Sequence, residues 1–231
     1  MKTLGLIGGM SWESSALYYQ IINQTIKAHL GNKHSCQCLL YSVDFAEIEQ
    51  LQHAGEWEEL GQRLAQIAQN LQLGGADMLI LCTNTMHKLA SWITEATSIP
   101  MLHIADATAE AVVASGIRKI GLLGTRFTMT EDFYKERLIS QYGLDVIIPA
   151  QRDIEIVHTI IYDELIQGVI NPQSKQAYLD IISRLEEQGA EGVILGCTEI
   201  TMLVKQTDVQ LPLFDTTQLH AEQAVLRLLA L

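Results

Sequence analysis

The chain has 231 residues, of which 48% are hydrophobic and 18% are charged, and its formal net charge is -12. This composition is typical of a folded globular protein with a sizeable core, and the length suits one large domain or two small ones. The acidic balance disfavours a nucleic-acid groove or an anionic membrane surface as a partner.

The N-terminal stretch MKTLGLIGGM is short and is interrupted by Gly8 and Gly9, so it predicts a first strand and not a signal peptide. No run of about 18 uncharged apolar residues predicts a membrane span. The four cysteines are sparse and irregularly spaced, which is typical of reduced thiols in a cytoplasmic protein. Cys36 and Cys38 are expected on one face of a strand, as core residues. The chain has no CxxC pair and no HExxH motif, so we expect no metal site.

Short apolar runs then alternate with helix-length segments along the chain. The runs are continuously apolar, as expected for strands buried on both faces, and their alternation with helices predicts parallel α/β sheets with right-handed crossovers. The expected strands are residues 2–8, 36–43, 77–82, 100–104, 118–124, 144–148, 191–196 and 211–214. The expected helices include residues 13–30, 56–73, 131–141 and 172–189.

Three blocks of sequence recur in the same order in the two halves of the chain. Any two βα units share some likeness, but an ordered triplet predicts two similar α/β halves related by a pseudo-two-fold. Ligands of open α/β sheets bind beyond the carboxyl ends of the strands, so two facing halves would share one cleft there. The paired blocks are residues 4–15 with 120–131, 74–86 with 188–200, and 99–113 with 211–226.

The loops at the expected strand ends are rich in glycine, hydroxyl and amide residues. Such loops present backbone N–H groups at helix N-termini, which favours carboxylate ligands. The first loop is not a GxGxxG fingerprint, and no Walker lysine is present. No acidic residue follows the second expected strand in the way that a dinucleotide ribose requires, and Asp44 is only the nearest candidate. A dinucleotide site is therefore disfavoured.

Three of these loops, GGMSWESS (8–15), TNTMH (83–87) and GCTEI (196–200), together resemble motifs of the aspartate/glutamate racemase superfamily. The resemblance covers essentially the whole chain. It implies two Rossmann-like α/β domains with the active site at their interface, and a C-terminal helix that returns to the first domain. The implied boundaries are residues 1–98 plus 217–231 for the first domain and 99–216 for the second. It also implies an amino-acid racemase that needs no cofactor and forms a homodimer.

In this superfamily two opposed groups remove the Cα proton of an amino acid from one face and return it on the other. Cys197 matches its family position in GCTE. The other family cysteine precedes Asn-Thr, where this chain has Thr83, and Cys82 lies one residue earlier. A shift of one residue on a strand turns a side chain to the opposite face, so we expect Cys82 to point into the domain and Thr83 to face the substrate.

Three interpretations follow. In the first, the racemase is asymmetric: one enantiomer reacts much faster through Cys197 than the other through Thr83, and the equilibrium constant is unchanged. In the second, a bulge re-aims Cys82 and restores a two-thiol racemase. In the third, a single thiol supports another reaction of the superfamily, such as decarboxylation. A carboxylate-binding module is the alternative that is not an enzyme.

The resemblance favours aspartate or glutamate as the substrate, and a broader choice of polar amino acids stays open. Arg126 is the best placed basic residue. His87 either orients the substrate end of its motif or caps the helix that begins there, and Glu199 either tunes Cys197 or anchors a substrate ammonium. The expected substrate-binding residues are Met10, Ser11, Gln52, Asn84, Thr85, Thr125, Thr128, Thr198 and Glu199.

Overall fold

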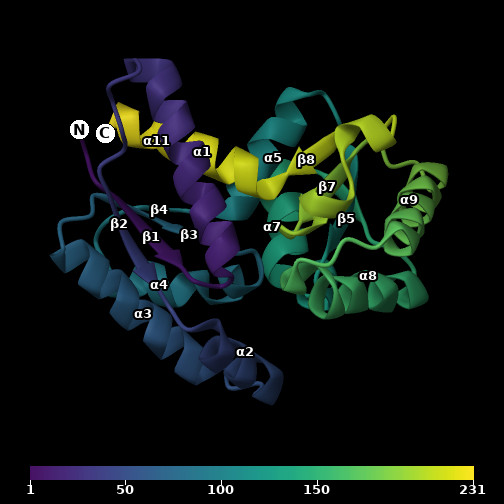
Figure 1. The fold of residues 1–231 in the computed structure, drawn as a ribbon, viewed down its shortest axis with the longest axis horizontal. Coiled ribbons are helices and arrows are strands. Elements are labelled where there is room, and N and C mark those ends of the chain that lie inside the picture. The colour runs from purple at the N-terminus through teal and green to yellow at the C-terminus, as the bar shows by residue number, and fades with distance from the viewer. The chain divides into compact units, whose positions relative to one another are not determined.

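The computed structural model describes residues 1–231 and contains two four-stranded, wholly parallel sheets (Figure 1). All eight expected strands are present. The two sheets have the same internal order, β2-β1-β3-β4 and β6-β5-β7-β8, which confirms an α/β fold with repeated halves. The strands are β1 (Leu4–Gly8), β2 (Cys38–Ser42), β3 (Met78–Leu81), β4 (Met101–Leu102), β5 (Lys119–Gly124), β6 (Asp145–Ile147), β7 (Val193–Gly196) and β8 (Leu213–Asp215).

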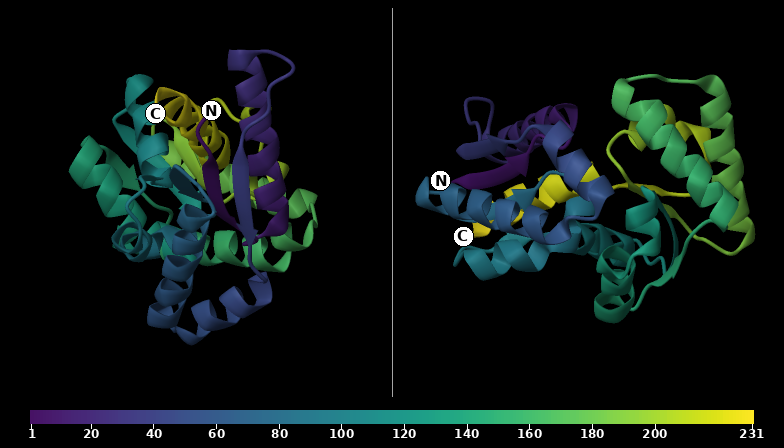
Figure 2. Two further views of the ribbon diagram at one scale, coloured as in Figure 1. Left: turned by 90° about the vertical axis from the view of Figure 1, so that its left-hand side faces the viewer. Right: turned by 90° about the horizontal axis from the view of Figure 1, so that it is seen from below.

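The chain forms two compact units, one from Met1–Ile104 with His220–Leu231 and the other from Ala105–Leu219. Both ends of the chain therefore belong to the first unit, and their labels lie close together in Figures 1 and 2. Helix α11 (Thr216–Ala230) begins in the second unit and continues in the first.

The helices of the first unit begin and end at residues suited to the task. Ser11 caps α1, and Asp44 caps α2 by accepting a hydrogen bond from the Ala46 amide at 3.1 Å. The helix predicted over residues 56–73 is α3, and its apolar face is buried against β1 and β3. The elements are α1 (Trp12–Leu30), α2 (Phe45–Ala54), α3 (Trp57–Leu73), the short 3-10 helix η1 (Thr85–Leu89) and α4 (Ala90–Ala96).

The second unit has its own apolar core. Buried side chains of α8 and α9 pack against β5 and β7, and Tyr178 is among the largest of them. Asn171 caps α9 and Pro172 takes its first position, a favoured start for a helix. The elements are α5 (Ile104–Ala114), α6 (Arg126–Thr130), α7 (Asp132–Tyr142), α8 (Gln151–Asp163), η2 (Leu165–Gln167), α9 (Pro172–Glu187), α10 (Ile200–Leu203) and η3 (Gln206–Asp208).

The expectation of strands buried on both faces is wrong for the edge strands β2 and β6, neither of which has a buried residue. Leu40, Tyr41 and Ser42 are exposed, because β2 is an edge strand and has a neighbour on one side alone. Cys36 precedes β2 instead of lying in it; it is buried, whereas Cys38 is half-buried and its thiol is also free.

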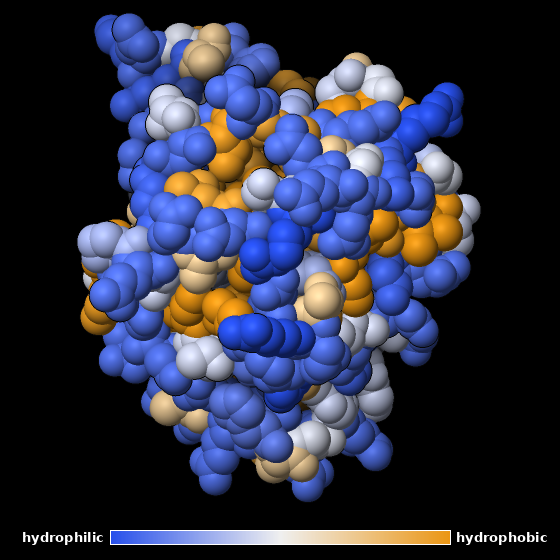
Figure 3. Space-filling model, turned by 90° about the vertical axis from the view of Figure 1, so that its right-hand side faces the viewer, coloured by the Kyte–Doolittle hydropathy of each residue, from blue (hydrophilic) through white to orange (hydrophobic).

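The surface carries scattered apolar side chains. On the face shown in Figure 3 they form patches separated by polar residues, as is usual for folded proteins. No helix combines the length and the apolar character needed to cross a membrane.

Candidate active site

Thr83 and Cys197 occupy the same position in the two repeated units. In the first sheet Ile7 of β1 lies opposite Leu81 of β3, and in the second Leu123 of β5 lies opposite Leu195 of β7. Thr83 is two residues beyond Leu81, and Cys197 is two residues beyond Leu195. Each therefore follows the end of a strand that pairs with the central strand of its unit.

Cys82 continues the ladder of β3 and is not re-aimed. Its amide donates a hydrogen bond to the Ile7 carbonyl at 2.8 Å, as a regular parallel strand requires. Its side chain is fully buried, and burial raises the pKa of its thiol. The ladder has no bulge at this point, and the chain turns only afterwards, where the Thr83 amide donates to the Leu81 carbonyl at 2.9 Å. Thr83 itself is half-buried.

The residues after Thr83 form the 3-10 turn η1. Asn84 and Thr85 are buried, and the Asn84 carbonyl accepts a hydrogen bond from the His87 amide at 3.1 Å. The His87 ring folds back so that Nδ1 lies 2.7 Å from the Thr83 carbonyl oxygen. His87 therefore contacts the backbone of Thr83 directly, as a residue that orients its motif must do.

The glycine loops at the ends of β1 and β5 are built alike. In the first, Ser11 Oγ accepts from the Ser14 amide at 3.3 Å and lies 3.2 Å from the Ser14 hydroxyl. In the second, Thr125 Oγ1 accepts from the Thr128 amide at 3.3 Å and lies 3.2 Å from the Thr128 hydroxyl. Both pairs are buried at a helix N-terminus, where polar donors gather.

Glycine is required in the first of these loops because the backbone folds tightly there. Gly9 has a φ of +91°, and a Cβ atom on it would lie 2.4 Å from the backbone nitrogen of Val43. Met10, the next residue, is buried with the apolar core of the first unit. Met10, which was expected to bind the substrate, therefore lies in the core of its unit.

Cys197 is paired with a carboxylate. Its Sγ donates a hydrogen bond to Glu199 Oε2 at 2.9 Å, and both side chains are half-buried. Burial, followed by the charge and hydrogen bond of Glu199, raises the pKa of the Cys197 thiol well above its ordinary value. The direction of this shift keeps the proton on the Cys197 sulfur at neutral pH.

The next residue, Thr198, is held by two hydrogen bonds from neighbouring hydroxyl groups. Its Oγ1 accepts a hydrogen bond from the Thr217 hydroxyl at 3.1 Å, and its carbonyl accepts from the Thr201 hydroxyl at 2.7 Å. Thr217 lies in the first turn of α11 and was not among the predicted site residues. The repeat that pairs residues 99–113 with 211–226 was the signal that could have drawn attention to it.

Gln52 and Arg126 were the residues best suited by type and place to recognise a polar substrate group. Gln52 is almost fully buried on α2, with 4% of its surface exposed. Arg126 is exposed and its Nη1 lies 3.2 Å from Glu155 Oε2, so its charge already has a partner. No group of three or more His, Cys, Asp or Glu side chains is arranged to hold a metal ion.

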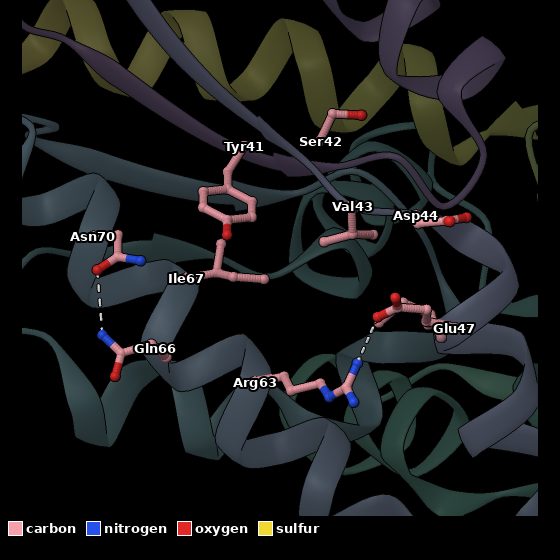
Figure 4. Close-up of a pocket in the computed structure, with 10 residues that line it drawn as sticks. Tyr41, Ser42, Val43, Asp44, Glu47, Arg63, Gln66, Ile67 and Asn70 are labelled. Carbon is pink, nitrogen blue, oxygen red and sulfur yellow. Dashed lines mark hydrogen bonds and ion pairs between the residues drawn. The ribbon is translucent and has the colours of Figure 1, made fainter.

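A pocket of about 440 Å³ lies in the first unit beside the end of β2, with α2 and α3 around it (Figure 4). Arg63 reaches across it to Glu47, with Nη1 3.0 Å from Oε2, and Gln66 donates to Asn70 (Figure 4). None of the predicted site residues lines this pocket. Its lining residue Val43 donates from its amide to the Gly8 carbonyl at 3.0 Å, so the pocket adjoins the first glycine loop.

A family model described as Asp/Glu/Hydantoin racemase matches residues 7–224. The chain belongs to the Asp/Glu/hydantoin racemase family. This confirms the family predicted from the three motifs.

Similar structures and sequences support the assignment to this racemase family. A crystal structure of a candidate Asp/Glu racemase from Yersinia pestis shares 53% identity, covers 99% of this chain and 100% of that one, and has a TM-score of 0.94. An aspartate racemase homologue from Pyrococcus horikoshii OT3 shares 34% identity, with 99% of each chain covered and a TM-score of 0.84. The broad specificity amino-acid racemase RacX of Bacillus subtilis is 25% identical over 176 residues, which cover 75% of this chain and 74% of the relative.

Proposed function

We propose that this member of the racemase family is a cofactor-independent amino-acid racemase that acts on aspartate or glutamate. The observation that carries the proposal is the equivalent position of Thr83 and Cys197 in the two repeated units. Racemisation needs one group to remove the Cα proton and another to return a proton to the opposite face. In this proposal Cys197 serves one face of the substrate and Thr83 serves the other.

The Cys197 step begins from the protonated thiol. The thiol proton passes to Glu199 Oε2, 2.9 Å away, and the resulting thiolate takes the Cα proton. The electron pair left on Cα spreads into the substrate carboxylate, where hydroxyl and amide donors stabilise the negative charge. The proposed donors are Asn84, Thr85, Thr125, Thr128 and Thr198, with Ser11, Gln52 and Glu199 around the remaining substrate groups and Met10 packed behind its loop.

The Thr83 step is the difficult one. The hydroxyl, or a water held by it, returns a proton to the opposite face, and the reverse reaction needs an alkoxide that is hardly populated at neutral pH. Racemisation has an equilibrium constant of unity, so kcat/KM must be equal for the two enantiomers. The asymmetry must therefore appear in kcat and KM separately, with the higher kcat matched by a higher KM.

Cα exchange in D2O tests the proposal. The enantiomer whose Cα–H faces Cys197 should gain deuterium with retention faster than it inverts, because the thiolate step is quick and the Thr83 step is slow. Its mirror image should gain deuterium only as fast as it inverts. A panel of L- and D-amino acids, followed by NMR and chiral chromatography without pyridoxal phosphate, measures both rates. Absence of exchange in every amino acid would refute the proposal.

Three variants test the roles of the residues. Cys197→Ser should abolish exchange with retention, and Thr83→Cys should bring the two kcat values closer together. Cys82→Ala should leave exchange intact, since Cys82 is buried within the ladder of β3. Loss of all exchange in Cys82→Ala would instead favour a two-thiol enzyme.

A broader specificity for polar amino acids is the second candidate function. It is favoured by the ion pair of Arg126 with Glu155, which leaves that guanidinium less able to select a substrate carboxylate. The same panel separates it from an acidic-substrate enzyme. Release of CO2 from a substituted malonate would indicate a decarboxylase, and thermal stabilisation by a carboxylate without exchange would indicate a binding module. Light scattering tests the predicted homodimer.

A further inference from the structure

Three histidines of the first unit form a buried cluster. The His87 ring centroid lies 4.5 Å from that of His103 and 5.7 Å from that of His220, and none of the three side chains is more than 7% exposed. Titratable rings are seldom buried together unless each has defined hydrogen bonds. The hydrogen bonds of His87 connect this cluster to Thr83.

The His87 ring has one tautomer that satisfies both of its hydrogen bonds. The Ile104 amide donates to Nε2 at 3.2 Å, so Nε2 must be the unprotonated, accepting nitrogen. The ring proton is then on Nδ1, which donates to the Thr83 carbonyl at 2.7 Å. Burial, followed by the charges that His103 and His220 could carry, lowers the pKa of His87 well below its ordinary value, so the ring is neutral.

The ring also joins two neighbouring strands of the sheet. Thr83 follows β3, and Ile104 follows β4, which pairs with β3 from Leu79 to Ile80. A rigid imidazole between the two strand ends holds the peptide plane after Thr83 in one orientation. That plane fixes the direction of the Asn84 backbone N–H and, through the ψ angle of Thr83, limits where the Thr83 side chain points.

We propose that His87 is a positioning residue that holds Thr83 for proton transfer through a neutral Nδ1–H bond to its backbone carbonyl, an inference that rests on the proposed function. His87 itself exchanges no proton with the substrate. The residue acts on one face of the reaction, because its hydrogen bond is to the backbone of Thr83. Its removal should therefore slow inversion and leave exchange with retention at the Cys197 face almost unchanged.

His87→Phe is the principal variant, because it keeps a ring and removes both polar nitrogens. A misplacement of about 1 Å at a reacting group costs roughly 100-fold, so we expect inversion to slow by about 10- to 100-fold. His87→Asn can still present an amide N–H near the position of Nδ1, and it should recover most of the inversion rate. In a Thr83→Ala background, His87→Phe should add little further loss, as expected for residues that act as a unit.

His220→Phe is the matched control. His220 is equally buried, and it too has two hydrogen bonds, one from the Tyr18 hydroxyl at 2.8 Å and one to the Leu102 carbonyl at 3.0 Å. The control should lose stability without a selective loss of inversion. Equal loss of inversion and retention in His87→Phe, or the same pattern in both variants, would overturn the proposal.

A spectroscopic measurement on the wild-type protein keeps the proposal testable if His87→Phe does not fold. Nitrogen-15 NMR of labelled histidine should show His87 protonated at Nδ1 and unprotonated at Nε2 across neutral pH. A ring protonated at Nε2, or charged, would contradict the inference. If the wild-type protein exchanges no amino acid, the proposed function fails, whereas the NMR spectrum still decides the state of the ring.

Discussion

Gly196→Ala tests how closely the end of β7, directly before Cys197, packs against its neighbours Leu123 and Thr128. A Cβ atom on Gly196 would lie 2.8 Å from the Leu123 carbonyl oxygen and 3.2 Å from Thr128 Cγ2. Ordinary contact begins at 3.4 Å, so the backbone before Cys197 must move by about 0.6 Å to relieve the closer contact. Overpacking of this kind costs about 1–3 kcal/mol, which corresponds to a fall in Tm of roughly 3–10 °C for a protein of this size.

The same displacement should slow exchange at the Cys197 face by about 10-fold, because a 1 Å misplacement costs roughly 100-fold. Thermal melts and Cα exchange in D2O measure the two effects. Gly121→Ala is the matched control in the same sheet, since its Cβ atom would meet a movable methyl of Leu185 at 3.0 Å. An unchanged Tm and exchange rate in Gly196→Ala would refute the reasoning, as would an equal loss of exchange in Gly121→Ala.

Three further predictions concern ionisation. Glu199→Gln should lower the pKa of Cys197, although burial keeps it above the ordinary value, so alkylation of this thiol by iodoacetamide should quicken at a fixed pH; an unchanged rate would contradict the pairing. A hydrogen bond from Cys36 lowers the pKa of Cys38 to about 7, so peptide mapping should find Cys38 alkylated first at neutral pH, and Cys36→Ala should slow it. The Thr3 amide, followed by Lys2, lowers the pKa of Asp77 in the folded state, so its stabilising contribution is present above an unfolded pKa near ~3.9 and is lost as the pH falls through the folded value. Asp77→Asn should accordingly be less stable than wild type in melts at pH 7 and nearly equal to it at pH 2, and a difference independent of pH would count against this.

Much of the fold could be predicted from the sequence because its signals are local. Apolar runs bounded by glycine and polar residues indicated every strand, and the repeated blocks indicated two equivalent sheets. The exposure of β2 could not be predicted in the same way. Whether a strand lies at an edge depends on which strands pair with it, and that is a property of the whole sheet.

The candidate site divides in a similar way. The residue types and the one-residue offset between Cys82 and Thr83 were readable in the motifs, because side-chain direction alternates along a strand. Two hydrogen bonds could not be predicted from the motifs: that of Cys197 to Glu199, and that of Thr217 to Thr198. They depend on how a turn folds and on where α11 begins. These contacts decide protonation states, which residue type alone leaves open.

By itself, the sequence determined the fold class, the repetition of its halves, the family, and the difference between a cysteine in one motif and a threonine in the other. Only the tertiary structure decided that Cys82 is buried within the ladder of β3 and that the Cys197 thiol donates a hydrogen bond to Glu199. It also decided that a neutral His87 joins the ends of β3 and β4. The physical reason is that alternation and motif spacing are carried by neighbouring residues. Burial, tautomers and pKa values are set by groups that folding brings together from distant parts of the chain.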